Sequence, residues 1–308
     1  MSNLILSAQM IFPLFVMIAL GYLLRKIDIF DERVCAKLNK FVFSFLMPAV
    51  LFHSICLSEF DFGSSMKILA FALISLIVLF IILMLVAPRF IKDKKDSGVL
   101  IQGVFRSNFI LLGLPICIAV YGEDNIQTTV LLIAFIVPLF NVLSVITFQS
   151  LTDKKPDFKS LVIGIFTNPI MIAAVAGFGL VILGIELPTV ILDTVSDISS
   201  MTTPLALIVL GAGFTLSGVK KYWKVLSWTV VLRLLVVPAV ILAVADYLGF
   251  EGEELVSTLI LFASPTAVSS FTMAKNYNAN EELAGQVVVV TTLISMFTLS
   301  LFLSIFTF

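Results

Sequence analysis

Residues 69–87 read LAFALISLIVLFIILMLVA and contain no charged side chain. About twenty consecutive apolar residues are enough to cross the hydrocarbon core of a bilayer as a helix. A barrel strand would alternate apolar and polar residues, and this stretch does not. Residues 230–245 form a second apolar run. The pattern therefore predicts membrane-spanning α-helices.

The composition of the whole chain supports the same fold class. Of its 308 residues, 60% are hydrophobic and 13% are charged. A soluble domain is closer to half apolar and a quarter charged. Backbone amides in lipid must be bonded within the chain, so continuous apolar runs become helices. We expect an all-α polytopic membrane protein with no soluble domain, and the net charge of −1 indicates no nucleic-acid partner.

Ten segments are long and apolar enough to be candidate spans. They are 4–24, 38–57, 67–87, 101–120, 128–149, 160–184, 199–218, 225–248, 255–274 and 284–306.

Charges in the loops orient the predicted spans, because Lys and Arg beside a span stay cytoplasmic. Lys67 at the edge of a span is the exception to an otherwise regular alternation. The basic loops are 25–37, 89–95, 154–159 and 220–224, with Lys275, and the acidic ones lie at 59–61, 123–124, 186 and 251–254. This alternation predicts a cell (plasma or inner) membrane protein with both termini outside.

A weak internal repeat divides the chain into residues 1–153 and 154–308. Proline and glycine recur 156 positions apart in the first two spans of each half. The pairs are Pro13 and Pro169, Gly21 and Gly177, and Pro48 and Pro204. Five spans in each half give the second half the opposite topology, which is an inverted repeat of the kind seen in secondary transporters. Alternatively, these residues are simply common in membrane helices.

Predicted spans four and nine each contain a proline well inside an apolar segment, Pro115 and Pro265. Proline lacks an amide hydrogen and clashes with the preceding turn. We expect each helix to break there and a new half-helix to begin, with Ser264 as the N-cap before Pro265. Two half-helix N-termini near mid-membrane would offer free amides to an anion. Ordinary proline kinks are the alternative.

Several motifs in this order resemble the auxin efflux carrier family, which includes the plant PIN carriers and bacterial malate or malonate permeases. They are GYLLRK at 21–26, LNKF at 38–41 before Met47-Pro48, RSN at 106–108 before GLP at 113–115, Asn168-Pro169, PLAL at 204–207 before Gly211, and SPT at 264–266 before AKNY at 274–277.

The resemblance implies ten spans in two inverted five-helix repeats, with spans four and nine crossing at their prolines. It implies a scaffold of spans one, two, six and seven beside a mobile transport unit. It also places the family's substrate-binding asparagine at Asn108, seven residues before Pro115. Only residues 150–159 join the halves here, unlike the long central loop of many plant members.

Polar groups inside the predicted spans are the candidates for function, because such groups are costly in lipid. Asn108 and Asn141 either bind substrate or bond to neighbouring helices. Arg106 and Arg233 either compensate the charge of an anion or extend toward the cytoplasmic face. The candidate substrate-binding set is Asn108, Gly113, Pro115, Asn141, Ser264, Pro265 and Thr266.

Three further residues are candidates for proton or cation coupling. His53 has a side chain that titrates near neutral pH, although its place near a span end also fits a structural role. Asp193 and Asp197 share a helix face, which also fits the wet side of an amphipathic lead-in to span seven. Cys35, Cys56 and Cys117 lack metal-ligand spacing, so we expect no metal site and no cofactor.

The sequence therefore predicts a carrier that moves small organic anions, such as dicarboxylates or auxin-like carboxylates, by alternating access. A channel, a membrane sensor and an intramembrane enzyme are the alternatives. One histidine and no His-Glu-x-x-His motif argue against a zinc protease, and no filter-like sequence indicates a channel. The anion, the direction of transport, the coupling ion and the oligomeric state, a homodimer included, stay open.

Overall fold

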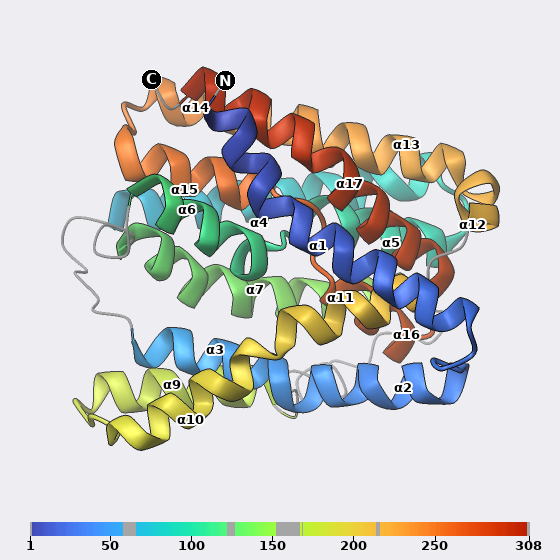
Figure 1. The fold of residues 1–308 in the computed structure, drawn as a ribbon. Helices are drawn as coiled ribbons and strands as arrows, with labels where there is room; N and C mark the ends of the chain where they lie inside the picture. The colour runs from blue at the N-terminus through green and yellow to red at the C-terminus, as the bar shows by residue number, and fades with distance from the viewer. Residues whose placement is uncertain are drawn as a thin grey trace.

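The computed structural model describes residues 2–57, 66–121, 127–151, 167, 169–213 and 216–306. The described residues form helices joined by short non-helical connections, and they contain one isolated β-bridge. The helices pack into one bundle, in which the first helix lies against the last and both chain ends lie at the same end (Figure 1).

The helices of residues 2–151 include two π-helical turns, named η. They are α1 (Ser2–Lys26), α2 (Glu32–Phe41), η1 (Val42–Leu46), α3 (Met47–Cys56), α4 (Met66–Phe90), α5 (Lys94–Phe105), η2 (Phe109–Gly113), α6 (Leu114–Tyr121) and α7 (Gln127–Leu151).

The second half contains one further π-helical turn. Its helices are α9 (Pro169–Ile182), α10 (Thr189–Ser200), α11 (Thr202–Ala212), α12 (Leu216–Lys221), α13 (Trp223–Val231), η4 (Leu232–Val236), α14 (Val237–Tyr247), α15 (Gly252–Ala263), α16 (Ser269–Asn276) and α17 (Glu281–Phe306).

Four helices in the described residues are long and apolar enough to cross a membrane. They are Met66–Phe90, Leu131–Leu151, Thr189–Ala212 and Trp223–Tyr247, and the bent pair Glu281–Ser295 and Phe297–Phe306 makes a fifth. The protein is therefore multi-pass. Ten spans stay a prediction, since predicted spans one, two, four, six and nine have no counterpart among these helices.

One face of α4 shows why this bundle needs lipid around it. Ile74, Val78, Ile81 and Leu85 follow helical spacing, and each exposes about half of its side chain or more. The opposite face, with Leu76 among its members, is buried. A continuous apolar stripe of this kind on a surface helix is unfavourable in water and favourable against acyl chains.

Each of the three π-helical turns in the described residues ends two residues before a proline. Pro48, Pro115 and Pro238 are the second residues of α3, α6 and α14. A proline within an α-helix clashes with the carbonyl four residues earlier. The wider π-turn moves that carbonyl away, so the chain stays helical through all three positions.

The expectation that span four breaks at Pro115 is therefore wrong. η2 runs directly into α6, and the interruption lies earlier, at residues 106–108. Span nine does break at Pro265, but Ser264 is the C-cap of α15 and α16 begins only at Ser269. Ser264 is thus not the N-cap that the sequence suggested, because four non-helical residues follow it.

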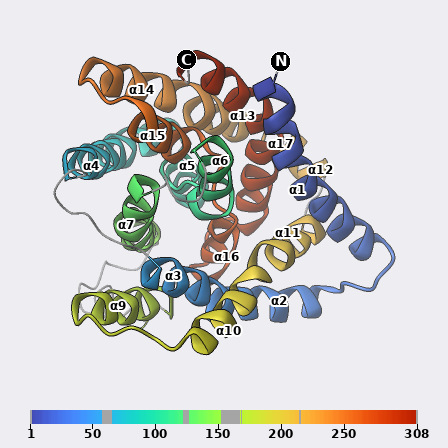
Figure 2. The same ribbon diagram turned by 60° about the vertical axis from the view of Figure 1, so that its left-hand side comes forward.

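The helices divide into two groups (Figure 2). The arc, as we call α1, α2, η1, α3, α9, α10 and α11, runs along one side of the molecule. α1 packs along α11, and α3 packs along α9. The remaining helices form the core group, which contains both interrupted helices.

The orientation of the bundle is testable by cysteine labelling. Glu251, before α15, and Lys92, between α4 and α5, are both exposed. In a background without the native cysteines, an impermeant maleimide added outside should modify Glu251→Cys and spare Lys92→Cys until the membrane is permeabilised. The opposite pattern would reverse the predicted orientation. Lys155, in a predicted cytoplasmic loop, lies outside the described residues.

Candidate functional site

The two interrupted helices of the core group meet backbone to backbone. The amide of Asn108 donates to the carbonyl of Pro265 at 2.9 Å, and the amide of Ala267 donates to the carbonyl of Arg106 at 3.1 Å. These bonds form an antiparallel bridge between Ser107 and Thr266. The two non-helical segments thereby satisfy part of each other's backbone hydrogen-bonding groups. Non-helical chain is tolerated within a membrane only where its backbone groups find such partners in the protein.

Arg106, the C-cap of α5, points its guanidinium group into the core group and is 3% exposed. Its N–H groups reach the hydroxyl of Ser269 at 2.9 and 3.1 Å and that of Ser144 at 2.9 Å. They also reach the side-chain oxygen of Asn141 at 2.7 Å and the carbonyl of Phe140 at 3.2 Å. Every one of these acceptors is neutral.

No carboxylate pairs with Arg106 within the part of the chain that the structure describes. A buried charge without a counter-charge is expensive, because the protein interior solvates it less well than water does. Neutral dipoles orient the guanidinium but leave its net charge uncompensated. The cavity therefore has a buried positive charge in its wall.

Ser269 is the first residue of α16. Its hydroxyl oxygen accepts two N–H groups from Arg106, which uses both of its lone pairs. The hydroxyl hydrogen must therefore point away from Arg106. No acceptor for this hydrogen is found among the described residues, so the Ser269 hydroxyl can donate to a ligand beside the buried cation.

Asn108 immediately precedes η2 and is 6% exposed. Its backbone takes part in the bridge, and no hydrogen bond of its side-chain amide is found among the described residues. Asn108 lines the cavity described below, so a ligand bound there can accept its side-chain N–H hydrogens.

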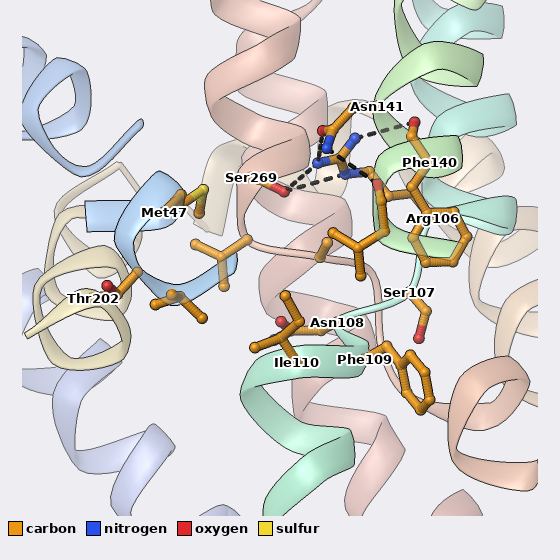
Figure 3. A pocket seen from close by; sticks show the side chains of 14 residues that line it. Met47, Arg106, Ser107, Asn108, Phe109, Ile110, Phe140, Asn141, Thr202 and Ser269 are labelled. Atoms are coloured by element: carbon orange, nitrogen blue, oxygen red, sulfur yellow. Dashed lines mark hydrogen bonds between the residues drawn. The ribbon is translucent and has the colours of Figure 1, made fainter. Parts of the chain in front are cut away.

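These groups line a small cavity of about 60 Å³ between the arc and the core group (Figure 3). Arg106, Asn108, Asn141 and Ser269 come from the core group. On the facing side Met47, Val50 and Thr202 come from the arc.

The predicted residues at the two interruptions have separate roles. Thr266 donates its hydroxyl to the carbonyl of Gly103 at 2.6 Å and does not line the cavity. A Cβ atom at Gly113 would lie 2.8 Å from Ile260, so this glycine lets α15 pack closely.

The hydroxyl of Ser264 is buried without a partner among the described residues. Pro265 supplies a carbonyl to the bridge, and Pro115 lies in α6 away from it.

The remaining predicted residues lie outside the cavity lining. Arg233 is fully buried, but it bonds to backbone carbonyls behind the bridge. His53 is half-buried on α3, and Asp193 and Asp197 are exposed on α10. As coupling groups these three stay predictions.

Sequence reasoning missed Ser269 and Ser144 as partners of Arg106, and Met47 and Thr202 on the opposite wall. Ser144 lies one turn after Asn141 on α7, so a search for polar residues at helical spacing would have found it. Met47 and Thr202 carry no such signal, because their position depends on how the arc packs.

Comparisons with known proteins agree with this picture. The family model described as "Membrane transport protein" (Mem_trans) matches residues 6–159 and 154–303. An uncharacterized transporter of Methanocaldococcus jannaschii is 23% identical, over 93% of this chain and 94% of its own length. An uncharacterized transporter of Escherichia coli strain K12 is 24% identical, over 86% and 87%. A Rhizobium meliloti protein named "Putative malonate transporter" is 22% identical, over 94% and 93%.

The family match covers nearly the whole chain and confirms the resemblance drawn from the motifs. The names of the family and of the relatives indicate a transporter, not an enzyme. With its apolar helices and its two interrupted helices, the chain belongs to the membrane transport protein family, Mem_trans, of the auxin efflux carrier type.

Proposed function

We propose that this protein is a secondary carrier that moves a small organic anion across the cell membrane by alternating access. The carboxylate of the substrate binds at the cavity, where it accepts hydrogen bonds from the Asn108 amide and the Ser269 hydroxyl. Arg106 lies behind Ser269 and supplies the compensating positive charge.

The observation that carries this proposal is the buried charge of Arg106. Its guanidinium is surrounded by neutral acceptors and shares a cavity with the Asn108 amide, for which no hydrogen bond is found among the described residues. A neutral sugar would leave the charge uncompensated, and an organic cation would be repelled by it. Asn108 and Ser269 also stand at the starts of the two half-helices, whose dipoles favour an anion.

The proposal includes ten spans in two inverted repeats, 1–153 and 154–308. Contacts in the arc support it. Thr202 donates its hydroxyl to the carbonyl of Leu46, 156 positions away, which is the offset of the recurring prolines and glycines. Gly21 lies against the carbonyl of Ile208, and Gly177 lies against the carbonyl of Phe52. Gly177 lies 156 positions after Gly21, and Phe52 lies 156 positions before Ile208. A two-fold axis that relates the two repeats requires such an exchange.

The location of the cavity supports alternating access. One wall belongs to the arc and the other to the core group, so rocking one group against the other would open the cavity first to one side and then to the other. A channel would not need such a division. Counterflow in proteoliposomes separates the two, because only a carrier exchanges labelled for unlabelled substrate faster than net flux.

The substrate class can be tested on purified protein with malonate, malate and a monocarboxylate as probes. Malonate is the first choice because the name of the Rhizobium meliloti relative contains it. A ligand that binds the folded state raises its melting temperature by mass action. We expect carboxylates to do so and neutral sugars or organic cations not to. Transport of a sugar or a cation alone would refute the proposal.

Asn108→Ala should weaken binding of the best carboxylate by about tenfold, the scale of one hydrogen bond to a charged group. Asn108→Asp should be worse, because it places a second negative charge beside the anion. Titration calorimetry on monodisperse protein measures both. Asn276 is exposed at the end of α16, so Asn276→Ala and Asn276→Asp are matched controls. Wild-type affinity in Asn108→Asp would contradict the assignment.

A further inference from the structure

Arg233 lies at the point where the two interrupted helices end. It belongs to η4 and is fully buried. Its Nε donates to the carbonyl of Ser264 at 2.8 Å, and its two terminal nitrogens donate to the carbonyls of Val104 at 2.9 Å and Leu261 at 3.2 Å. One side chain thus binds the last turns of both α5 and α15.

Each of these carbonyls lacks its ordinary helical partner for a visible reason. The amide that would pair with Leu261 belongs to Pro265, which has no hydrogen there. The amide that would pair with Val104 belongs to Asn108 and donates to Pro265 instead. Ser264 is the C-cap of α15, beyond which the chain leaves the helix. Three carbonyl oxygens at two negative helix ends therefore converge on one point.

Such a point is a ligand set for a cation. Hard cations take neutral and charged oxygen ligands. In transporters with broken helices, the unwound carbonyls and half-helix C-terminal ends coordinate the coupling ion. Arg233 forms no ion pair with any carboxylate in the described residues, so its charge is held by these carbonyls alone.

We propose that Arg233 is a tethered cation that permanently occupies the carbonyl site at the crossing, where a dissociable monovalent cation would otherwise bind. Its role is positioning, because it holds both half-helix ends in place without lining the substrate cavity. The wild-type protein therefore needs no free cation to form the crossing. Removing the Arg233 side chain creates a cation site that can be filled from solution.

Chemical rescue tests this inference on the full-length protein in detergent. Arg233→Ala should melt several degrees below wild type. Millimolar ethylguanidinium chloride should raise its melting temperature in a saturable way, and sodium chloride should do so less effectively. Choline chloride at the same ionic strength should have no effect, because choline cannot donate hydrogen bonds to three carbonyls. The wild-type melting temperature should respond to none of the three beyond ionic strength.

Two variants control for simple loss of packing. Leu234 is the next residue of η4 and is also fully buried, so Leu234→Ala should be destabilised without cation rescue. Arg233→Met fills the space without a charge, so it should be destabilised and should not respond to ethylguanidinium. If Arg233→Ala is recovered only when ethylguanidinium is present during purification, that result supports the proposal equally.

Wild-type stability in Arg233→Met, or equal rescue of Arg233→Ala and Leu234→Ala, would overturn the proposal. Failure to recover Arg233→Ala under every cation while Arg233→Met folds normally would overturn it as well. The role of Arg233 in transport rests on the proposed carrier function, but its cation-like binding to the three carbonyls does not. Its readout is melting temperature against cations, so its failure would leave the anion site at Arg106 and Asn108 untouched.

Discussion

Arg106→Gln should lower the affinity for the best carboxylate substrate on the order of 100-fold, the largest binding effect that we expect from a single substitution. Removing one partner of a buried charge pair costs about 2–5 kcal/mol, and each 1.4 kcal/mol is tenfold in the dissociation constant. Glutamine keeps a polar group near Ser269 but removes the charge. Calorimetry and counterflow should both register the loss.

Two further arginine variants distinguish charge from geometry. Arg106→Lys keeps the charge and loses the planar fork that contacts Ser269, Asn141 and Ser144, so its loss of affinity should be smaller than that of Arg106→Gln. Arg89 is exposed at the end of α4, and Arg89→Gln should bind like the wild type. Normal affinity in monodisperse Arg106→Gln would mean that the buried charge serves the fold and not the substrate.

Gly211→Ala should be among the most destabilising single substitutions in the chain, although it lies away from the cavity. A Cβ atom at Gly211 would be 2.0 Å from the carbonyl oxygen of Ile18, and one at Gly21 would be 1.9 Å from that of Ile208. These are backbone atoms, so the helices themselves must separate. Overpacking usually costs about 1–3 kcal/mol, and separating α1 from α11 falls at or above the upper end.

A matched glycine in α9 gives the control. Gly179 has no heavy atom within 4 Å of an added Cβ, so Gly179→Ala should be neutral or slightly stabilising. Melting curves of the two variants in the same detergent measure the difference. The fraction of Gly211→Ala that stays folded should bind carboxylate like the wild type. Equal melting temperatures for the two variants would show that the arc tolerates a wider spacing.

The two prolines in the centres of spans four and nine show the limit of local reasoning. Both have the same covalent chemistry, yet Pro265 stands at an interruption and Pro115 stands inside a helix. The ring of a proline within an α-helix clashes with the carbonyl four residues earlier. Either a break in the helix or a π-turn before the proline moves that carbonyl away. Pro265 lies within the non-helical segment 265–267, whose backbone bonds to residues 106–108, so the helix can end there. Pro115 lies outside both segments, and the chain before it forms the π-turn η2 instead.

The sequence alone determined the all-helical membrane fold, the family and the candidate asparagine, because these depend on hydrophobicity, length and local motifs. It also identified Arg106 and Arg233 as unusual, since charges within apolar segments are costly wherever they lie. Only the tertiary structure separated their roles. Arg106 faces side-chain dipoles and a cavity, whereas Arg233 faces carbonyls of two helix ends. The acceptors lie 34 to 163 residues away from Arg106 and 28 to 129 residues away from Arg233, so their convergence is a property of packing and not of sequence.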